Sequence, residues 1–447
     1  MVYLLLGVFA ILGVMMILVL RPIAIVSVLV LSRALADIGY AAGHAILPSG
    51  LLALSLAVLA WLAVAVKFPS RVLEARLFST SLFICAALSI LSYFYRFGIA
   101  IEPLVFFLNL SSVVPLFLLG RSAGSSVQVG LSTKCIVFLC SVPCIIMVIG
   151  LYLFPSMTVG TNGRPAGTFV HANAAGSFIA VAVTCLVWAT LTNGVRHIVP
   201  LLFCLWALVL TGSLNALVTA FAGVSVVCLL VPTSVLARTL SVFLGVAGVW
   251  AALALTELGE RVSGVLASDF SFTIASGTSR NSIEWRVLNW FELYELWQRS
   301  PVVGFGLGST LSRIQPLSGP AHSLYVQLLV ETGVVGLFAL VLVVAHFSVY
   351  VFRVRRSSPR SQFVSLSVGV VVCLGVNGLA SNLLSSGAVL FLASTVLGLS
   401  VGMTGLVLGS RLSGNKSVDR ELSVLGTAAP DRDGSISSVP MPSRKGC

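Results

Sequence analysis

Charged residues are scarce in this chain. Only 9% of its 447 residues are Asp, Glu, Lys or Arg, whereas a soluble domain usually has about 25%. Hydrophobic residues make up 58% and the mean hydropathy is +1.07, which excludes an ordinary soluble protein. Apolar runs of roughly 20 residues, long enough to span a bilayer, recur from end to end. The composition therefore predicts a polytopic helical membrane protein.

Acidic residues are the scarcer charged class, with 14 Asp and Glu against 26 Lys and Arg and a formal net charge of +12. In a soluble protein this balance would suggest a nucleic-acid partner. In a membrane protein it reflects Lys and Arg held in cytoplasmic loops. We therefore expect membrane lipids, and no nucleic acid, as partners.

The nine cysteines indicate neither a disulfide framework nor a metal site. Eight lie inside apolar runs and Cys447 is the last residue. CxxC spacing, typical of metal ligands, is absent, and no metal or cofactor is expected. The N-terminal segment lacks a basic region and a small-residue cleavage site, so we expect a first span rather than a removed signal.

The apolar runs predict an all-α membrane domain over residues 1–409 with about 12–13 transmembrane helices. The tail 410–447 is rich in Ser, Pro and Gly and is expected to be disordered and cytoplasmic. The predicted spans are about 2–20, 23–42, 51–67, 77–94, 100–119, 133–154, 174–192, 198–211, 214–231, 239–256, 322–351, 363–380 and 386–409.

Basic residues fall in alternate loops, most strongly in "RVRRSSPR" at 353–360. The positive-inside rule places these loops in the cytoplasm. The loop 154–173 and the large loop 257–321 are then extracytoplasmic. The large loop has five arginines against six acidic residues, so it is not a general surface for polyanions and any role of its arginines must be local.

The large loop contains a predicted amphipathic helix. Asn281 and Glu284 have the spacing of a capping box. Apolar residues then recur at i, i+3, i+4 and i+7, and an i,i+4 pair follows them. We expect the helix to lie on the outer membrane face and to end in a flexible glycine turn. The apolar residues are Val287, Trp290, Phe291 and Tyr294, the pair is Glu295 and Arg299, and the turn contains Gly304, Gly306 and Gly308.

Seven polar side chains are candidates for chemistry at the outer face. Arginine forks onto phosphate oxygens, so converging arginines suit a diphosphate. Histidine carries protons near neutral pH. Each of these residues could instead have a purely structural role. An arginine could be solvated or could snorkel to the headgroups, and a histidine or asparagine could cap or pack at a helix start. The candidates are Arg164, His171, Asn173, Arg280, Arg286, His322 and Glu331.

Glu331 differs from the others because it lies within an apolar run, about 14 Å along the helix from His322. At that depth a carboxylate should face the bundle interior, protonated or paired. A break at Gly333 could instead bring it near water. The glycine run before it could suggest a nucleotide site, but GxGxG without a preceding strand is weak evidence.

Taken in order, the motifs are more specific than their parts. They are "GRPAGTFVHAN" before a span, then Thr-Gly-Ser, then the two loop arginines, "SPVVGFGLG" and "AHSLYVQLLVETGVVGL". This series resembles the O-antigen ligase and O-antigen polymerase superfamily of membrane glycosyltransferases over about residues 155–350. The chain departs from the family pattern at Leu214, where arginine is common, and at Ser323, where asparagine is common.

The resemblance implies a GT-C-like helical fold with its active face outside the cytoplasm. The donor would be an undecaprenyl-diphosphate-linked glycan and the acceptor a glycan, a lipid or a protein. Arg164, Arg280 and Arg286 match diphosphate-contacting positions, and His322 matches a histidine that activates the acceptor hydroxyl. His171, Asn173 and Glu331 are possible accessory residues.

Three functions follow as hypotheses for a multi-pass protein of the inner or plasma membrane. The first is transfer or polymerisation of lipid-linked glycan in O-antigen, capsule or exopolysaccharide assembly, with polymerisation favoured over ligation. The second is a flippase or transporter of lipid-linked glycan, which would favour charged or broken helices near the midplane. The third is a peptidoglycan polymerase of the cell-shape and division family. For a base such as His322, we expect titration in the neutral range, lowered by nearby arginines.

Overall fold

The computed structural model describes residues 17–38, 49–68, 76–160, 163–231, 258–357 and 362–405, together with Gly13 and Met15. Across these ranges the chain is all-helical and has no sheet, only an isolated bridge between Val159 and Pro165. Most of the predicted first span, the predicted span 239–256 and the predicted tail 410–447 lie outside the described residues.

The predicted all-α membrane class is confirmed. Among the described residues, six helices are long and apolar enough to cross a membrane. They are Phe106–Ser126, Val129–Leu153 (α8), Ala172–Asn193 (α10), Leu324–Ser357 (α18), Gln362–Leu379 (α19) and Gly387–Gly405. Shorter apolar helical stretches of 10–17 residues occupy further predicted spans. They are Pro22–Leu35 (α2), Ser55–Lys67 within Ser49–Lys67 (α3), Phe83–Phe97 within Arg76–Phe97 (α5), Val195–Leu210, which includes Ile198–Leu210 (α11), and Leu214–Leu230 (α12).

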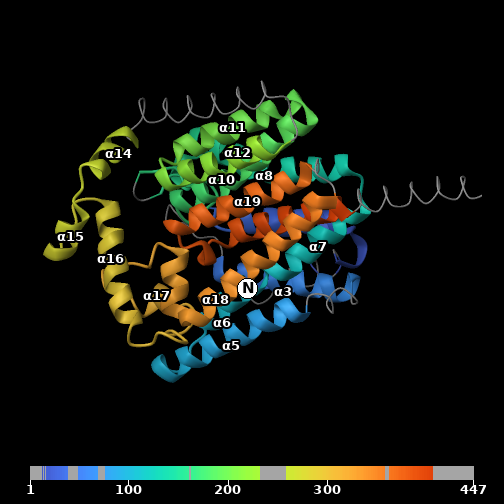
Figure 1. Ribbon diagram of the computed structural model, residues 1–447. Coiled ribbons are helices and arrows are strands. Elements are labelled where there is room, and N and C mark those ends of the chain that lie inside the picture. Colours follow the sequence, from blue (N-terminus) through green and yellow to red (C-terminus); the bar gives the residue numbers. More distant parts are fainter. Residues whose placement is uncertain are drawn as a thin grey trace, which may run out of the picture. The chain divides into compact units, whose positions relative to one another are not determined.

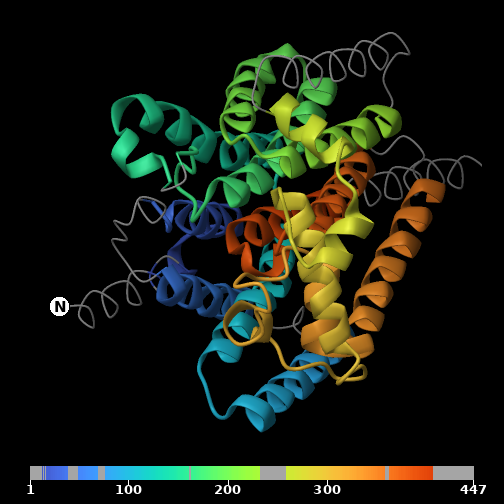
Figure 2. The ribbon, with the colours of Figure 1, turned by 90° about the vertical axis from the view of Figure 1, so that its left-hand side faces the viewer.

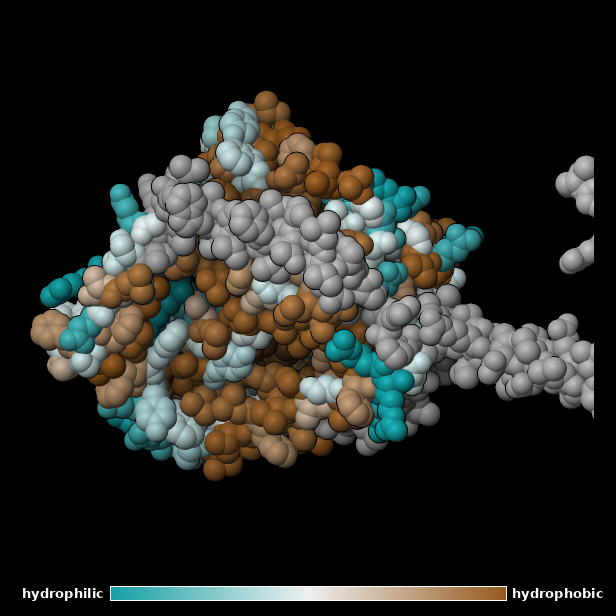
Figure 3. All heavy atoms as spheres, turned by 45° about the horizontal axis from the view of Figure 1, so that its top comes forward, coloured by the Kyte–Doolittle hydropathy of each residue, from teal (hydrophilic) through white to brown (hydrophobic). Residues whose placement is uncertain are grey.

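Large apolar side chains remain exposed along the helices, as expected where lipid replaces water. Phe338 on α18 is 63% exposed and Leu202 on α11 is 56% exposed. In the space-filling view, apolar side chains cover much of the visible described surface (Figure 3). Large apolar residues are thus found on the outer faces of the helices as well as in the core between them.

Helix α10 is buried on nearly all sides and packs against α8, α11, α12 and α19. Small residues allow these close contacts. A Cβ added to Gly223 of α12 would come 2.2 Å from Sγ of Cys373 on α19. Fully buried Trp188 of α10 donates a hydrogen bond of 2.8 Å to the carbonyl of Gln362. This packing fixes the ends of α10, α12 and α19, which position the candidate site.

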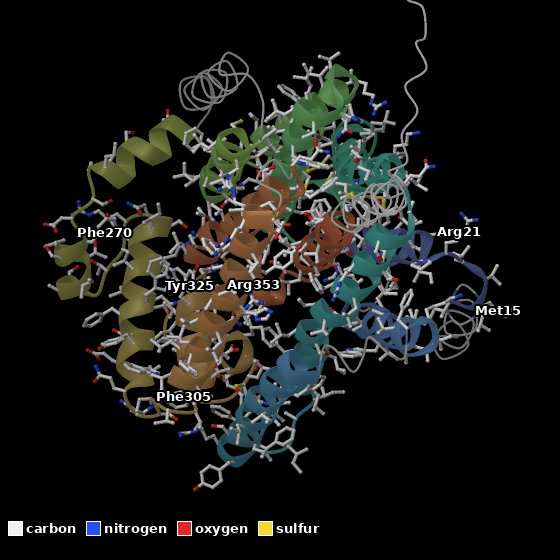
Figure 4. All side chains as sticks on the ribbon, turned by 45° about the vertical axis from the view of Figure 1, so that its right-hand side comes forward. Met15, Arg21, Phe270, Phe305, Tyr325 and Arg353 are labelled. Carbon is white, nitrogen blue, oxygen red and sulfur yellow. The ribbon has the colours of Figure 1, made fainter. Side chains whose placement is uncertain are left out.

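Helix α18 is broken at Gly333, where φ is +64° and ψ is −161°. The glycine-containing loop fills the break. The N–H of Phe305 donates to the carbonyl of Val330 at 2.8 Å, and the N–H of Val334 donates to the carbonyl of Pro301 at 2.9 Å. Phe305 lies on this loop (Figure 4). The prediction of a flexible glycine turn was therefore wrong, because the loop replaces the hydrogen bonds that the break removes from the helix.

Three helices of the large loop follow one another: Leu258–Leu266 (α14), Phe270–Ser276 (α15) and Ser282–Trp297 (α16). Figure 1 shows α16 running across the ends of several helices of the bundle, and Figure 2 views it from that side. The amide oxygen of Asn281 accepts hydrogen bonds from the N–H groups of Ile283 and Glu284, so the predicted N-cap is confirmed.

The predicted apolar stripe of α16 is not its packed face. The buried residues are Glu284, Leu288, Asn289 and Leu293. Phe291 and Tyr294 of the stripe are 40% and 47% exposed. A side chain on the stripe can face lipid as easily as protein, and sequence spacing cannot distinguish the two. The predicted pair was also wrong, since no salt bridge joins Glu295 to Arg299 in the structure.

Candidate functional site

A small pocket lies where three segments meet. These are the start of α10, the turn before α18, and the segment 380–386 between α19 and the helix Gly387–Gly405. Its lining includes two of the predicted histidines. The lining residues are His171, Asn173, His322, Ala380, Ser381, Asn382, Ser385 and Ser386.

Arg164 lies on the loop before α10 and is held in place by two elements. Its Nε and Nη2 donate to the carbonyl of Thr211 at 3.0 and 2.6 Å. Its Nη2 also donates to Oδ1 of Asn173 at 3.2 Å. Thr211 precedes α12, whose N-cap is Ser213. The arginine thus joins the starts of α10 and α12 and sets the orientation of the Asn173 amide at the pocket.

His171 is the N-cap of α10, with extended backbone angles (φ −159°, ψ 162°). Its Nδ1 accepts a hydrogen bond of 2.9 Å from the N–H of Ala174. Burial lowers the pKa of His171 and the Arg164 charge lowers it further, whereas a hydrogen bond to its own backbone and the charge of Asp37 oppose the shift. The capping role considered from the sequence is thus present, and the side chain also lines the pocket.

His322 stands two residues before α18 with a φ of +49°, a left-handed conformation that is uncommon for a residue other than glycine. Its ring lies edge-on to Trp285, with 5.6 Å between ring centroids and 71° between ring planes. Burial lowers the pKa of His322 to about 4, helped by the charge of Arg286 and by His171. The imidazole is therefore neutral at pH 7.

Helix α16 holds the turn that carries His322. Asn289 Nδ2 donates to the carbonyl of Pro320 at 3.0 Å, and Trp290 Nε1 donates to the carbonyl of Ala321 at 2.6 Å. A Cβ at Gly319 would come 2.6 Å from the Trp285 ring. These contacts hold the turn in place and so stabilise the left-handed backbone conformation of His322.

The two loop arginines occupy different environments. Arg286 is half-buried and its Nη1 donates to the carbonyl of Ala380, a pocket residue, at 3.2 Å. Burial lowers the pKa of Arg286, which stays cationic near neutral pH. Arg280 is exposed, and its guanidinium lies 5.7 Å from the ring centroid of Phe272. The structure brings Arg286, and not Arg280, to the pocket residues.

Glu331 is fully buried and binds the glycine loop instead of lining the pocket. Its Oε2 accepts from the N–H of Gly308 at 2.9 Å. Its Oε1 accepts from the N–H and the hydroxyl of Thr310 at 3.2 and 2.5 Å, and from Gln327 Nε2 at 3.2 Å. The N–H of Gly306 donates to the backbone carbonyl of Glu331 at 2.9 Å. These N–H groups are already bonded, which speaks against a nucleotide site at the glycines.

Sequence reasoning missed a buried ion pair near the pocket. Arg33 Nη1 of α2 donates to Oδ2 of Asp37 at 2.9 Å, and the two side chains are 9% and 5% exposed. A Cβ added to Gly387, next to the pocket residue Ser386, would come 2.8 Å from Nε of Arg33. Opposite charges four residues apart inside the predicted span 23–42 are the signal that could have found them.

Sequence reasoning also missed the segment 380–386, because its Ser and Asn residues resemble an ordinary polar turn. No group of three or more His, Cys, Asp or Glu side chains is placed to hold a metal ion within the described ranges. Of the two departures from the family pattern, Ser323 has a hydrogen-bond partner and Leu214 begins a helix. Ser323 Oγ donates to the carbonyl of Gly378 at 3.4 Å, and Leu214 is the first residue of α12.

Residues 199–341 match the family model described as O-antigen ligase. No curated protein matches the chain. The match contains Arg280, Arg286, His322 and Glu331 and begins after the segment 164–173, which the structure brings to the same pocket. The chain is a multi-pass membrane enzyme with an O-antigen ligase domain over residues 199–341.

Proposed function

We propose that the protein is a glycosyltransferase that transfers or polymerises undecaprenyl-diphosphate-linked glycan during cell-surface polysaccharide assembly. The observation that supports this proposal is the composition of one pocket. Its lining includes His322, from the O-antigen ligase domain, and His171 and Asn173, from outside that domain. Arg286 of the same domain contacts the lining at Ala380. Arg164 and Arg286 are hydrogen-bonded to residues of the pocket lining, beside a neutral histidine. This arrangement suits a reaction that needs a base for a hydroxyl and positive charge for a leaving diphosphate.

In the proposed reaction the acceptor hydroxyl attacks the anomeric carbon of the donor sugar. The bond from that carbon to the diphosphate oxygen breaks, and the diphosphate leaves with the electron pair. His322 is neutral at pH 7 and takes the hydroxyl proton. We assign the diphosphate to Arg286 and Arg164. Arg280, exposed over Phe272, would have to leave that ring to reach the same group.

We further propose that the pocket faces outside the cytoplasm, in the inner or plasma membrane. Successive helices run toward and away from the pocket. From the order of the helices, the ends opposite the pocket carry four basic residues: Arg121, Lys134, Arg196 and Arg353. The positive-inside rule puts these residues in the cytoplasm. Cysteines introduced at Ser268 and Ser357 test this with an impermeant thiol reagent. Labelling of position 357 but not 268 in intact cells would contradict the proposal.

A flippase or transporter is less well supported. The break at Gly333 is the kind of discontinuity that transporters use near the midplane. Here, however, the loop around Phe305 fills the break, and every oxygen of the Glu331 carboxylate accepts a hydrogen bond. A peptidoglycan polymerase of the cell-shape and division family is the other enzyme alternative, and nothing described at the pocket favours it.

The lipid-linked material that accumulates in a deletion strain tests these functions. A polymerase, which we favour, leaves single repeat units on the outer face, while a ligase leaves long lipid-linked chains that lack their acceptor. A flippase leaves material on the inner face. Normal surface polysaccharide together with defective peptidoglycan would favour the cell-shape alternative.

A further inference from the structure

The two ring nitrogens of His171 have different hydrogen-bonding roles. The N–H of Ala174 donates to Nδ1 at 2.9 Å, so Nδ1 must hold a lone pair. A neutral imidazole then carries its hydrogen on Nε2. The residue is surrounded by protein on most sides, which accounts for its lowered pKa, but part of it stays open to solvent and lines the pocket. While it caps α10, His171 can therefore donate a hydrogen bond to a ligand in the pocket, but it cannot accept one through Nε2.

The charged and titratable groups around His171 keep this state. Arg164 on the preceding loop disfavours an added proton, as does burial, whereas Asp37 of α2 favours one; burial has the largest effect and the pKa of His171 is lowered. His322, which lies on the turn before α18 and lines the same pocket, is itself neutral. Protonation at Nδ1 would also cost the helix its N-cap hydrogen bond.

His171 shares its wall of the pocket with other hydrogen-bond donors. Oδ1 of Asn173 accepts from Arg164 Nη2, which leaves the Asn173 amide nitrogen as the donor on that side chain. The segment 164–173 thus offers N–H groups to the pocket, whereas His322 on the turn before α18 offers a lone pair. An anion fits the first segment and a hydroxyl to be deprotonated fits the second.

We propose that His171 is a fixed hydrogen-bond donor to the donor-lipid diphosphate and not a second general base. This inference rests on the proposed function. No proton leaves His171 during transfer: its Nε2–H stays bonded to a phosphate oxygen while the carbon–oxygen bond breaks and negative charge grows on the leaving diphosphate.

The cap and the donor can be separated by substitution. His171→Ser keeps an efficient N-cap in the same extended backbone and removes the ring. His171→Asn keeps the cap and a shorter N–H donor. Asp269→Ser is the matched control, because it also exchanges one capping residue for another, on α15 and away from the pocket lining. Thermal stability in lipid nanodiscs should be similar for all four proteins.

The test measures the affinity of each full-length protein in nanodiscs for undecaprenyl diphosphate, with undecaprenyl monophosphate as comparison. A hydrogen bond to a charged group predicts a loss of roughly 10- to 100-fold for His171→Ser, a smaller loss for His171→Asn and none for Asp269→Ser. Affinity of His171→Ser equal to that of the wild type would overturn the inference. Failure of the wild type to prefer the diphosphate would overturn the proposed function itself.

The pH dependence of transfer supplies an independent readout. A donor that never gives up its proton is not the source of the rising limb, so His171→Ser should lower kcat/KM at every pH and keep that limb. The limb should move only slightly upward in pH, because His171 is the smallest of the three influences that lower the pKa of His322. A rising limb that disappears in His171→Ser but persists in His322→Ala would make His171 the base and contradict the inference.

Discussion

The indole N–H of Trp290 donates a hydrogen bond of 2.6 Å to the carbonyl of Ala321, the residue directly before His322. The loop helix and the pocket histidine are thereby joined through one backbone group. Asn289 binds the carbonyl of Pro320 in the same way. Helix α16 therefore acts on the site by holding the turn in which His322 has its left-handed backbone.

Trp290→Phe should reduce turnover more than it reduces folding. The substitution keeps an aromatic ring but removes the partner of the Ala321 carbonyl, a cost of about 1–3 kcal/mol concentrated in the turn. Turnover and thermal stability of the purified protein, measured side by side, check this. Phe291→Leu, on the exposed side of α16, is the control and should leave both unchanged. Equal turnover of the two variants would contradict a role for α16 in positioning His322.

The pH profile should report the low pKa of His322. The neutral form is the base, so kcat/KM should rise as pH increases through about 4 and stay flat across the neutral range. His322→Ala should lower turnover by about 10²- to 10⁴-fold while undecaprenyl diphosphate still binds. A rising limb near pH 6.5 would mean that neither burial nor Arg286 acts on the histidine as described.

The free energy of unfolding should decrease at acidic pH because of the lowered pKa of His322. Since the folded pKa of His322 is about 4, lower than the ordinary value near 6.5, the unfolded chain binds more protons between these values. The contribution of His322 to stability is therefore constant above about pH 6.5 and falls as pH drops toward 4. His322→Gln should lose this part of the acid dependence, which thermal unfolding at pH 4.5 and 7.5 can measure.

The sequence predicted a neutral-range titration for His322, and the structure explains the difference. The influence of arginines was expected, but the burial that comes first among the causes was not. It comes from the turn 319–322 being held against α16, with Trp285 at the imidazole ring. No spacing in the sequence shows that a loop helix and a helix start will enclose a particular side chain.

Helical spans, in contrast, were predictable because they depend on local composition and not on contacts between distant segments. The thickness of the bilayer sets the length of an apolar run, so α8, α10 and α19 could be placed from composition alone. The glycine loop could not, because its hydrogen-bond partners lie some distance along the chain: Phe305 with Val330, and Gly306 with Glu331. A glycine run looks flexible until the groups it approaches are known.

The effect of an Arg→Lys substitution on turnover should depend on how near the arginine lies to the pocket. Arg286→Lys loses the guanidinium that reaches Ala380 beside His322, and should lower turnover strongly because lysine cannot fork onto phosphate. Arg280→Lys, exposed over Phe272, should have a smaller effect. Arg299→Lys is the control and should be nearly silent, as exposed charges usually are. Donor affinity and kcat measured for all three give the ranking, and equal sensitivity would indicate a generally fragile loop.

Substitutions where the break of α18 meets the glycine loop should act on folding rather than on chemistry. Gly333→Ala places a Cβ 2.2 Å from the Val302 carbonyl oxygen at a φ of +64°, and should cost about 2 kcal/mol or more. Glu331→Gln leaves the amide nitrogen facing N–H donors such as Gly308. Both should lower the yield of folded protein, measured by fluorescence-detected size exclusion. Full yield of Glu331→Gln with lost turnover would instead place Glu331 in the reaction.

The buried pair Arg33–Asp37 should show strong coupling. Removing one partner leaves an uncompensated buried charge and is expected to cost about 3–5 kcal/mol, while removing both costs much less. Arg33→Met and Asp37→Leu should therefore each fold poorly, and the double variant should recover. The double variant also tests whether the pair serves the pocket, since Asp37 lies close enough to influence His171 and Arg33 lies against Gly387. If the recovered double variant binds undecaprenyl diphosphate like the wild type, the pair is structural. If it folds normally but binds weakly, the charges of α2 help to set the electrostatics of the pocket, and the site extends beyond the O-antigen ligase domain to the first described helices.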